Sequence, residues 1–471
     1  MKRIAIPLLA LVAVSATAAT PSLEEADRAA AARPLGMNPA PLRTETVGRR
    51  AVEWFEHDAD PAWGGAALKS QLAVAKPVAG DAKGAGLLVV LHSRGGGRPD
   101  GGIVAQVKTI DDKESVYTAP DGFYVLVPDC MHGMNCVEQR NPDFWWGGSD
   151  RFRGPVKEDV PRYLQGPTPA EKRLLDSVEW TIRRYGIDRN RVYLAGNSMG
   201  GQGALALGLP HGEVFAAIHA NVPATIWLPA ARLGFLAPDG SLLPPPAAPS
   251  PLADPPVLLD WSGSNDHWSR NHELLWEGLR ARRMSLVGLW GDYGHEGSIE
   301  KARAKNDLVG SFDVFSVTRD KPYPVFTNAS CDDKAPWPFA VYKPQFNTWG
   351  GYAGDVKSAE TKVAEGAKSA GQINAFFRWK ALADEARGVA MELWIESPEA
   401  LGTKQFAVPQ TATADVTLRR VRVARPAPGR RYAWVFGAQK GVVAVGPDGL
   451  LTIPGLALSR TRTRLLVRPA P

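Results

Sequence analysis

A serine flanked by glycines is the feature of this sequence with the clearest chemical potential. Ser198 lies in the motif Gly196-Asn197-Ser198-Met199-Gly200, directly after the apolar segment 191–195. This spacing predicts a nucleophile elbow, in which a strand turns sharply into a helix and holds the serine hydroxyl above the sheet. The flanking glycines are needed because a Cβ atom there collides with the following helix. The motif also arises by chance in glycine-rich chains, so its catalytic partners must be found elsewhere in the sequence.

A serine hydroxyl becomes a good nucleophile only when an imidazole takes its proton and a carboxylate orients that imidazole. In chains with a nucleophile elbow, the acid and the histidine follow the serine in that order, on loops after later strands. Asp266 follows the predicted strand 257–261, and His295 follows the predicted strand 285–290. The sequence therefore predicts Ser198 as nucleophile, Asp266 as acid and His295 as base.

Other residues compete for the roles of acid and base. Asp266 could instead cap the helix that begins near residue 269. Asp260 is the main rival acid, although it lies inside an apolar strand, whereas Asp292 is too close in sequence to His295 to approach the ring from the usual side. His267 and His272 border the acid loop and are predicted to be pocket or surface residues, whereas His219 is predicted to be a core residue or a residue that supports the site from behind.

Acyl transfer also needs two N–H donors directed at the developing oxyanion. The first is predicted to be the backbone amide of Met199, which follows the nucleophile. The second should come from the glycine-rich loop 92–97 after the first buried strand, where Ser93 or Arg94 is favoured. No Gly-Lys-Ser/Thr follows these glycines, so the loop is not a phosphate-binding P-loop, and the alternative to an oxyanion role is a plain tight turn.

Aromatic residues near the predicted loops indicate how a substrate could be held. Planar apolar rings are suited to stacking on an aromatic acyl group or a sugar. Each of these rings could equally be part of the core. The candidates for substrate binding are Trp145, Trp146 and Trp268.

Continuous apolar runs alternate with helical periodicity through the middle of the chain. Such alternation is typical of an α/β fold whose parallel strands are buried on both faces. We predict an α/β domain over residues 84–308, with a lid-like insertion at 223–256 and an N-terminal leader, 21–83, that packs on it and holds one edge strand at 51–55. The predicted strands are 86–92, 123–129, 192–195, 214–219, 257–261 and 285–290, and the predicted helices are 169–185, 199–209, 270–283 and 298–306.

Beyond residue 310 the sequence changes to short alternating segments separated by Pro- and Gly-containing turns. These segments predict strands at 312–317, 390–395, 432–436 and 463–467. The sequence therefore predicts a β-sandwich-like accessory domain over residues 311–471.

Composition and the N-terminus limit the classes of function. Residues 1–20 combine two basic residues, an apolar run and small residues, which is typical of a signal peptide and predicts a secreted or periplasmic protein. The apolar run is too short for a membrane span, and no later stretch qualifies. Without this segment, 53 basic residues face 49 acidic ones, a mild net charge of about +4 with no basic, aromatic-interleaved block. Nucleic-acid binding is therefore disfavoured.

The chain contains three cysteines. In an oxidising compartment, Cys130 and Cys136 are close enough in sequence to close a small disulfide loop, leaving Cys331 over. The alternatives are three buried free thiols, or a disulfide from Cys331 to either Cys130 or Cys136.

Three segments together carry a family resemblance: Leu91-His92 with its glycine-rich loop, residues 185–201, and Gly294-His295. They resemble the secreted α/β-hydrolases related to feruloyl and acetylxylan esterases, a group that shades into polyhydroxyalkanoate depolymerase-like and prolyl-oligopeptidase-like enzymes. The resemblance covers about residues 87–308, and the lead into the elbow, 188–193, is its most specific part. It implies an α/β-hydrolase fold with the same three catalytic residues. One departure is Ser93, which stands where these enzymes usually carry glycine and leaves the second oxyanion donor open.

These observations together predict an exported serine hydrolase that cleaves carboxylic esters through an acyl-enzyme. Feruloyl- or acetyl-type esters of polysaccharides, or related aromatic esters, are the expected substrates, and the mechanism requires neither a cofactor nor a metal. Two alternatives stay open. One is a prolyl-oligopeptidase-like serine peptidase, for which no anchoring site for a peptide terminus is recognisable. The other is a non-catalytic binding protein on a hydrolase scaffold, against which the intact Ser, Asp and His argue.

Overall fold

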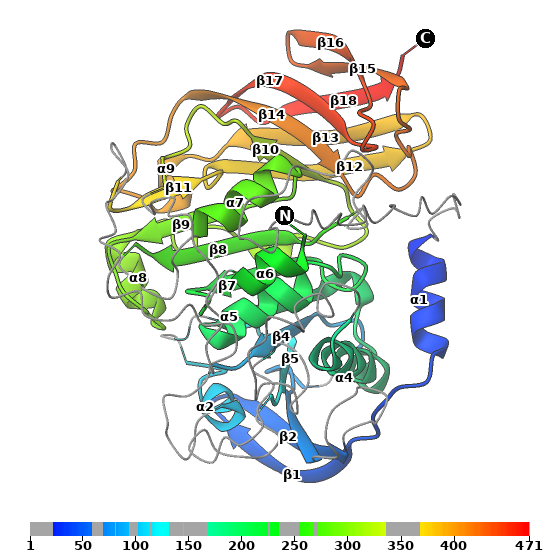
Figure 1. The fold of residues 1–471 in the computed structure, drawn as a ribbon, viewed down its shortest axis with the longest axis vertical. Helices are drawn as coiled ribbons and strands as arrows, with labels where there is room; N and C mark the ends of the chain where they lie inside the picture. The colour runs from blue at the N-terminus through cyan, green and yellow to red at the C-terminus, as the bar shows by residue number, and fades with distance from the viewer. Residues whose placement is uncertain are drawn as a thin grey trace, which may run out of the picture.

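The computed structural model describes residues 22–58, 69–80, 82–93, 102–112, 115, 117–130, 145, 167–224, 227–234, 254–264, 266, 272–335 and 368–470. The N-terminal strands lie at one end of the molecule and the C-terminal strands at the other, with a mixed sheet and its helices between them (Figure 1). Within these ranges, no helix combines the length and the apolarity that crossing a bilayer requires.

Ten strands form the main sheet. They are β1 (Ala40–Val47), β2 (Arg50–Asp58), β3 (Lys69–Ala75), β4 (Leu87–Leu91), β5 (Tyr124–Pro128), β6 (Val192–Asn197), β7 (Ala217–Asn221), β8 (Val257–Gly263), β9 (Val287–Gly291) and β11 (Gly371–Ile373). Their order across the sheet is β1-β2-β3-β5-β4-β6-β7-β8-β9-β11. The central strands from β5 to β9 are parallel, whereas the pairs at both margins are antiparallel. The carboxyl ends of the parallel strands therefore share one edge of the sheet.

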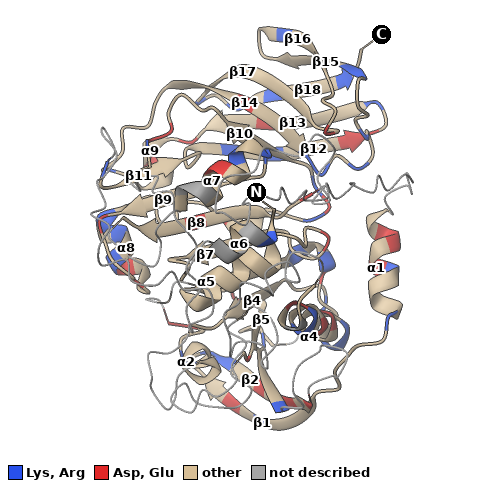
Figure 2. Cartoon of the chain, in the orientation of Figure 1, with Lys and Arg blue, Asp and Glu red and all other residues tan. Residues whose placement is uncertain are grey.

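Helices cover both faces of this sheet. One face carries α2 (Ile103–Lys108) and α8 (Ile299–Lys305), and the other carries α4 (Pro169–Tyr185), α5 (Met199–Gly203) with its π-helical continuation η4 (Ala204–Gly208), α6 (Trp227–Arg232) and α7 (His272–Ala281). Successive residues of β6 serve different cores, since Tyr193 packs on the first face and Leu194 on the second. Burial on both faces explains why these strands are continuous apolar runs in the sequence and carry little charge (Figure 2).

Helix α4 begins and ends where its sequence indicates. Thr168 and Glu171 form a capping box around Pro169, the first helical residue. Gly186 ends the helix in a left-handed conformation with φ 65°. The helix predicted at residues 169–185 is therefore confirmed, and its short loop leads through η3 (Arg189–Arg191) directly into β6.

The fully buried carboxylate of Glu171 also anchors two neighbouring segments. It accepts from Arg232 of α6 at 2.9 Å through both oxygens and contacts Nε2 of His211, after η4, at 2.6 Å. Burial alone would lower the pKa of His211, but hydrogen bonds to the carboxylates of Glu171 and Glu213 outweigh it and raise this pKa to about 9. The imidazolium form of His211 therefore stabilises the folded state.

Replacing His211 with glutamine is expected to make the protein less stable in a pH-dependent way. Because the pKa of His211 rises from 6.5 to about 9 on folding, its contribution is fully present below about pH 6.5 and is lost as the pH rises through about 9. Urea unfolding of both proteins at pH 6 and pH 9.5 measures this. The stability difference should shrink by on the order of 3 kcal/mol between the two pH values. A difference that does not change with pH contradicts this role.

The C-terminal region forms two antiparallel sheets. One contains β10 (Tyr323–Thr327), β14 (Thr411–Arg419) and β17 (Leu451–Ser459), and the other contains β12 (Phe377–Glu385), β13 (Gly388–Ile395), β15 (Arg431–Phe436), β16 (Gln439–Ala444) and β18 (Thr463–Pro469). Val416 and Ile453 of the first sheet share a core with Met391 and Leu465 of the second. This is a β-sandwich-like accessory region, and the strands predicted at 390–395, 432–436 and 463–467 are confirmed. A short helix, α9 (Pro398–Leu401), follows β13.

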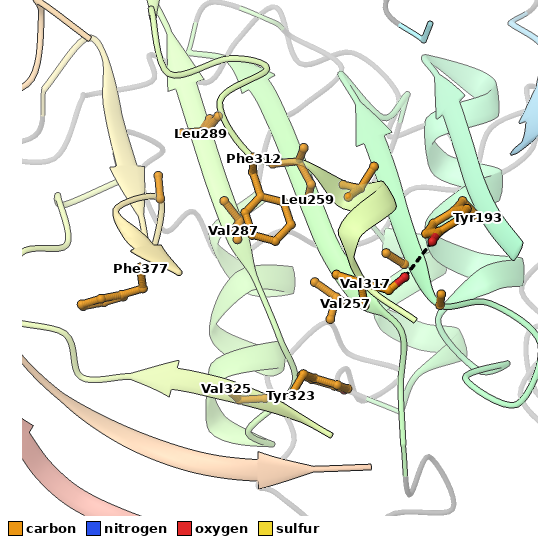
Figure 3. Packing of buried hydrophobic residues seen from close by; sticks show 14 of the residues in the cluster. Tyr193, Val257, Leu259, Val287, Leu289, Phe312, Val317, Tyr323, Val325 and Phe377 are labelled. Carbon is orange, nitrogen blue, oxygen red and sulfur yellow. Dashed lines mark hydrogen bonds between the residues drawn. The ribbon is translucent and has the colours of Figure 1, made fainter. Parts of the chain in front are cut away.

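The strand predicted at residues 312–317 is wrong. The segment contains a 3₁₀ turn, η5 (Val314–Ser316), because the side chain of Asp313 accepts from the Phe315 amide and folds the chain back. Its apolar residues pack on the main sheet, and the hydroxyl of Tyr193 donates to the Val317 carbonyl at 2.7 Å (Figure 3). The alternating burial arises because a turn packs on the sheet. Such a turn can produce the same alternation of apolar and polar residues as a strand.

The N-terminal segment is more structured than the leader predicted for residues 21–83. It contains helix α1 (Leu23–Ala32), and β1, β2 and β3 extend the main sheet rather than forming one edge strand. Strand β1 is exposed over almost its whole length, so it lacks the apolar pattern that would have revealed it. At the other margin, β11 returns from beyond residue 308 to pair with β9. Of the lid-like insertion predicted at 223–256, only α6 and the two ends lie within the described residues.

Candidate active site

Ser198 lies at the sharp turn between β6 and α5 that its motif predicts. Its backbone has φ 57° and ψ −119°, a conformation that residues other than glycine rarely adopt. The Ser198 amide donates to the Asn221 carbonyl at 3.0 Å, and the Ser198 carbonyl accepts from the amides of Gln202 and Ala224 at 3.0 Å. The strained conformation is therefore held from both sides by the neighbouring strand and helix.

The two flanking glycines permit very close backbone contacts. A Cβ atom on Gly196 would lie 2.0 Å from the carbonyl oxygen of Gly200 in the following helix. A Cβ atom on Gly200 would lie 1.9 Å from the carbonyl oxygen of Leu91 at the end of β4. The second collision is with a strand rather than with the helix, so Gly200 brings the elbow against the loop that follows β4.

Replacing Gly196 with alanine is expected to destabilise the fold by at least about 3 kcal/mol, because rigid backbone cannot move away from the new methyl group. Gly122→Ala is a matched control, since a Cβ atom on Gly122 has nothing within 4 Å. Melting temperature and soluble yield of both variants measure the effect. Equal stability of the two variants would show that the elbow is less tightly packed than described.

The structure brings the three predicted residues into one hydrogen-bonded chain. His295 Nε2 lies 2.6 Å from Ser198 Oγ, and His295 Nδ1 lies 2.8 Å from Asp266 Oδ2. The Asp266 side chain is fully buried, whereas that of His295 is 27% exposed. An ionised carboxylate can only accept, so Nδ1 carries the proton and Nε2 is left to accept from the serine hydroxyl. This is the tautomer that a general base needs.

Two loops in contact position the acid and the histidine. Asp266 follows β8, and His295 follows β9, the next strand in the sheet. A Cβ atom on Gly263, at the end of β8, would lie 2.2 Å from the Tyr293 carbonyl oxygen. Ser264 also donates to the Gly291 carbonyl, through its amide at 2.8 Å and through its hydroxyl at 3.0 Å. The loop that carries the acid and the loop that carries the histidine are therefore fixed to each other.

The rival acid Asp260 points to a different histidine. Its carboxylate is fully buried and contacts His272 Nε2 at 2.7 Å and the indole N–H of Trp276 at 2.7 Å, both on α7. Asp260 and His272 thus join β8 to the helix that packs on it. The prediction of His272 as a pocket or surface residue is therefore wrong, because its ring is fully buried on the carboxylate of Asp260. The other rival acid, Asp292, is exposed.

Of the other two candidate histidines, His219 lies within the described residues and His267 does not. His219 accepts from the indole N–H of Trp261, and burial lowers the pKa of His219 to about 4, so this imidazole is neutral at pH 7. His219 is half-buried, and its ring packs edge-on against the buried Tyr117, next to the core where it was expected.

The loop after β4 is held by a buried histidine. His92 Nδ1 lies 2.9 Å from the Ser93 carbonyl oxygen, which can only accept, so Nδ1 carries a proton. His92 Nε2 lies 3.1 Å from the Cys130 amide, which donates to it, and 3.3 Å from the Asp129 carboxylate. The hydroxyl of Ser93 donates to the Asn197 carbonyl at 2.8 Å and joins this loop to the elbow. Met199 is the first residue of α5, where amides have no partner within the helix. Arg94, the other predicted oxyanion donor, lies outside the described residues.

Trp145 is fully buried beneath this loop rather than presented to solvent. Its indole N–H donates to the His92 carbonyl at 3.1 Å, and its ring packs edge-on against His92. A Cβ atom on Gly203 of α5 would lie 2.5 Å from Trp145 Cβ. The ring therefore supports the loop and offers no face to a substrate in this structure. The other two candidates for substrate binding, Trp146 and Trp268, lie outside the described residues.

The predicted disulfide between Cys130 and Cys136 lies outside the described residues, because Cys136 is not among them. Cys331 forms no disulfide in the part of the chain that the structure describes, and burial raises the pKa of its thiol to about 12.

Sequence reasoning did not find Asn221 or the role of Asn197. Asn221 is a fully buried polar residue at the end of β7, directly beside the elbow. The signal that could have identified Asn221 is its type and position. It is a polar residue at the end of a buried apolar strand, and that strand lies next to the strand of the nucleophile.

The protein has a central parallel sheet with helices on both faces. Its elbow serine follows β6, and the acid and the histidine follow β8 and β9 in that chain order. These features define the fold. The core of this protein has the α/β-hydrolase fold.

Comparisons with known proteins find similarity in structure alone. No protein-family model matches the sequence, and no curated protein matches it. Among solved structures, an acetyl xylan esterase from Paenibacillus sp. R4 is 13% identical with a TM-score of 0.36, covering 62% of this chain and 93% of its own. A ferulic acid esterase is 14% identical with a TM-score of 0.34, covering 52% and 92%. An S-formylglutathione hydrolase from Agrobacterium tumefaciens is 16% identical with a TM-score of 0.35, covering 54% and 92%. At these identities and TM-scores the similarity says nothing about the substrate.

Proposed function

We propose that this protein is a serine hydrolase that cleaves carboxylic esters. The observation that carries the proposal is the unbroken chain of hydrogen bonds from Asp266 through His295 to Ser198, with the serine on a strained elbow. A serine, a correctly protonated imidazole and a buried carboxylate in this order supply a nucleophile, a base and the group that orients the base.

The reaction starts when Ser198 Oγ attacks the ester carbonyl carbon and His295 Nε2 takes the serine proton. The negative charge that develops on the carbonyl oxygen is stabilised by the Met199 amide and by an amide of Ser93 or Arg94. His295 then gives its proton to the departing alcohol and leaves an acyl group on Ser198. Water, deprotonated by His295, attacks this acyl-enzyme and releases the acid. Asp266 keeps the imidazole oriented and stabilises its charged form throughout.

We further propose feruloyl- or acetyl-type esters of polysaccharides, or related aromatic esters, as substrates of an exported enzyme. The resemblance carried by the elbow, its lead segment and the Gly294-His295 pair supports this class. Trp146 and Trp268 are the proposed stacking residues. Residues 1–20 are the proposed signal peptide, and a mature chain that begins near residue 21 in the medium or periplasm is the expected result of N-terminal sequencing.

A substrate panel tests the reaction class. p-Nitrophenyl acetate, methyl ferulate and acetylated xylan are compared with a peptide p-nitroanilide under the same conditions. Hydrolysis of esters with little or no cleavage of the anilide supports the proposal. Preferential cleavage of the anilide indicates a serine peptidase instead, and hydrolysis of neither class indicates a binding protein on a hydrolase scaffold.

A further inference from the structure

Two carboxamide side chains lie side by side where the nucleophile strand and its neighbour end. Asn197 is the last residue of β6 and Asn221 the last residue of β7, and the two are register partners in the parallel sheet. Asn221 is fully buried, and Asn197 is half-buried. Buried amides need hydrogen-bond partners, so the partners of these two show what they hold.

The direction of each hydrogen bond follows from one group that can only accept. Nδ2 of Asn221 lies 3.2 Å from the Glu296 carbonyl oxygen, so the amide nitrogen must face it. The same nitrogen donates to Oδ1 of Asn197. Nδ2 of Asn197 then donates to the hydroxyl oxygen of Ser93 at 3.1 Å, and that hydroxyl donates back to the Asn197 carbonyl at 2.8 Å. The chain of donors thus runs from Asn221 through Asn197 to Ser93, whereas Asn221 Oδ1 has no hydrogen-bond partner among the described residues.

These contacts connect three separate parts of the site. Ser93 belongs to the loop after β4, Asn197 precedes the nucleophile, and Glu296 follows His295. The Asn221 backbone carbonyl in addition accepts from the Ser198 amide at 3.0 Å. We propose that Ser93, Asn197 and Asn221, here named the amide bridge, are positioning residues. They fix the loop that follows β4 (the oxyanion loop) and the loop that carries His295 (the histidine loop) relative to the nucleophile. This inference rests on the proposed ester hydrolysis.

The side chains of the amide bridge act on geometry and do not contact the reacting atoms; any oxyanion contact of Ser93 would come from its backbone amide, which the substitutions below retain. Removing the Asn221 carboxamide leaves the Asn197 Oδ1 atom and the Glu296 carbonyl without their donor. The histidine loop and the oxyanion loop can then move relative to Ser198. Errors of about 1 Å in such alignment reduce rates by about 100-fold. The expected effect therefore falls on kcat, while KM changes little because the surfaces that hold the substrate remain.

Ser93 is a second position at which a substitution can break the amide bridge. The enzymes that this chain resembles usually carry glycine at this position, and here a serine hydroxyl ends the bridge. Ser93→Ala removes that hydroxyl, whereas Ser93→Thr retains it. If one connected unit does the positioning, breaking it at Ser93 after it is already broken at Asn221 adds little further loss.

The test measures kcat, KM and melting temperature for Asn221→Ala, Ser93→Ala, the double variant and Ser93→Thr, with the best ester of the panel as substrate. Asn306→Ala is the matched control, because Asn306 is an equally buried asparagine that donates to the carbonyls of Trp290 at 2.7 Å and Gly371 at 3.0 Å. We expect Asn221→Ala and Ser93→Ala each to lower kcat about 10- to 100-fold with KM within about threefold. The double variant should be close to the worse single variant, Ser93→Thr should keep most of the activity, and Asn306→Ala should lower only the melting temperature.

The outcomes separate the amide bridge from the reaction itself. A folded Asn221→Ala protein with kcat within about threefold of wild type overturns the bridge while leaving the esterase proposal intact. Fully multiplicative losses in the double variant, or an equal loss of kcat in Asn306→Ala, overturn it as well. The rate of Ser198 labelling by a fluorophosphonate gives a second readout that needs no particular ester, and the same pattern of losses is expected in it. A wild-type protein that neither hydrolyses esters nor reacts with the probe overturns the proposed function, and the amide bridge with it.

Discussion

Ser198→Ala is expected to lower kcat for ester hydrolysis by about 10⁵- to 10⁶-fold, with little change in KM or melting temperature. The substitution removes one oxygen atom and keeps the Cβ atom, so the backbone strain at φ 57° is unchanged and the packing of the elbow is retained. Only the nucleophile is lost. Whatever turnover remains comes from substrate binding and the oxyanion donors acting on water.

The losses of Ser198→Ala and His295→Ala are not expected to multiply in the double variant. His295→Ala should lose about as much activity as Ser198→Ala, and the double variant should be hardly worse than either, because the two groups act as one unit. Steady-state kinetics on p-nitrophenyl acetate, with melting temperatures as the fold control, measure all three. Turnover of Ser198→Ala within about tenfold of wild type would refute the nucleophile.

Asp266→Asn is expected to lower kcat by about 10⁴-fold. The carboxylate of Asp266 accepts from His295 Nδ1 at 2.8 Å and so keeps Nε2 free to accept from Ser198. An amide can present its N–H₂ group instead and hold the imidazole with the proton on Nε2. The histidine can then no longer act as base toward the serine, although the geometry of the site changes little.

Asp260→Asn is the matched control for this variant, because it makes the same chemical change in the same strand-loop segment. The hydrogen bonds of the Asp260 carboxylate go to His272 and Trp276 on α7 and not to His295 or Ser198. This variant should lose about 1–3 kcal/mol of stability and keep kcat within about tenfold. The reverse pattern, with activity lost in Asp260→Asn and kept in Asp266→Asn, would exchange the roles of the two acids. Kinetics and urea unfolding on both proteins decide between them.

The elbow and the hydrogen-bonded chain of side chains could be anticipated because their chemistry depends on local sequence. A glycine-flanked serine after an apolar run dictates its own backbone geometry, and loops that follow parallel strands must gather at one edge of the sheet. The position of Asp266 after its strand favoured it over Asp260, which lies inside the strand. What Asp260 does instead could not be predicted, because α7, which supplies His272 and Trp276, packs against β8 only in the folded chain.

Other parts of the fold depend on contacts that leave no periodic pattern. Strand β1 is exposed, so its place in the sheet comes from pairing with β2 rather than from burial. Strand β11 joins the main sheet from far along the chain, which no local pattern encodes. The segment 312–317 has the alternation of a strand but forms a turn, because Asp313 offers the backbone a competing hydrogen bond. Asn221 lies beyond the strand predicted at 214–219, because β7 begins and ends later than its apolar pattern indicates, and the role of Asn221 emerges only from its neighbours.

Covalent labelling shows whether Ser198 is an activated nucleophile. The wild-type protein is treated with a fluorophosphonate probe, the added mass is measured on the intact chain, and the labelled peptide is sequenced. We expect one label per chain on Ser198, none in Ser198→Ala, and strongly slowed labelling in His295→Ala. A label at another residue, or ester hydrolysis by a protein whose Ser198 never reacts, would contradict the role of Ser198 as nucleophile.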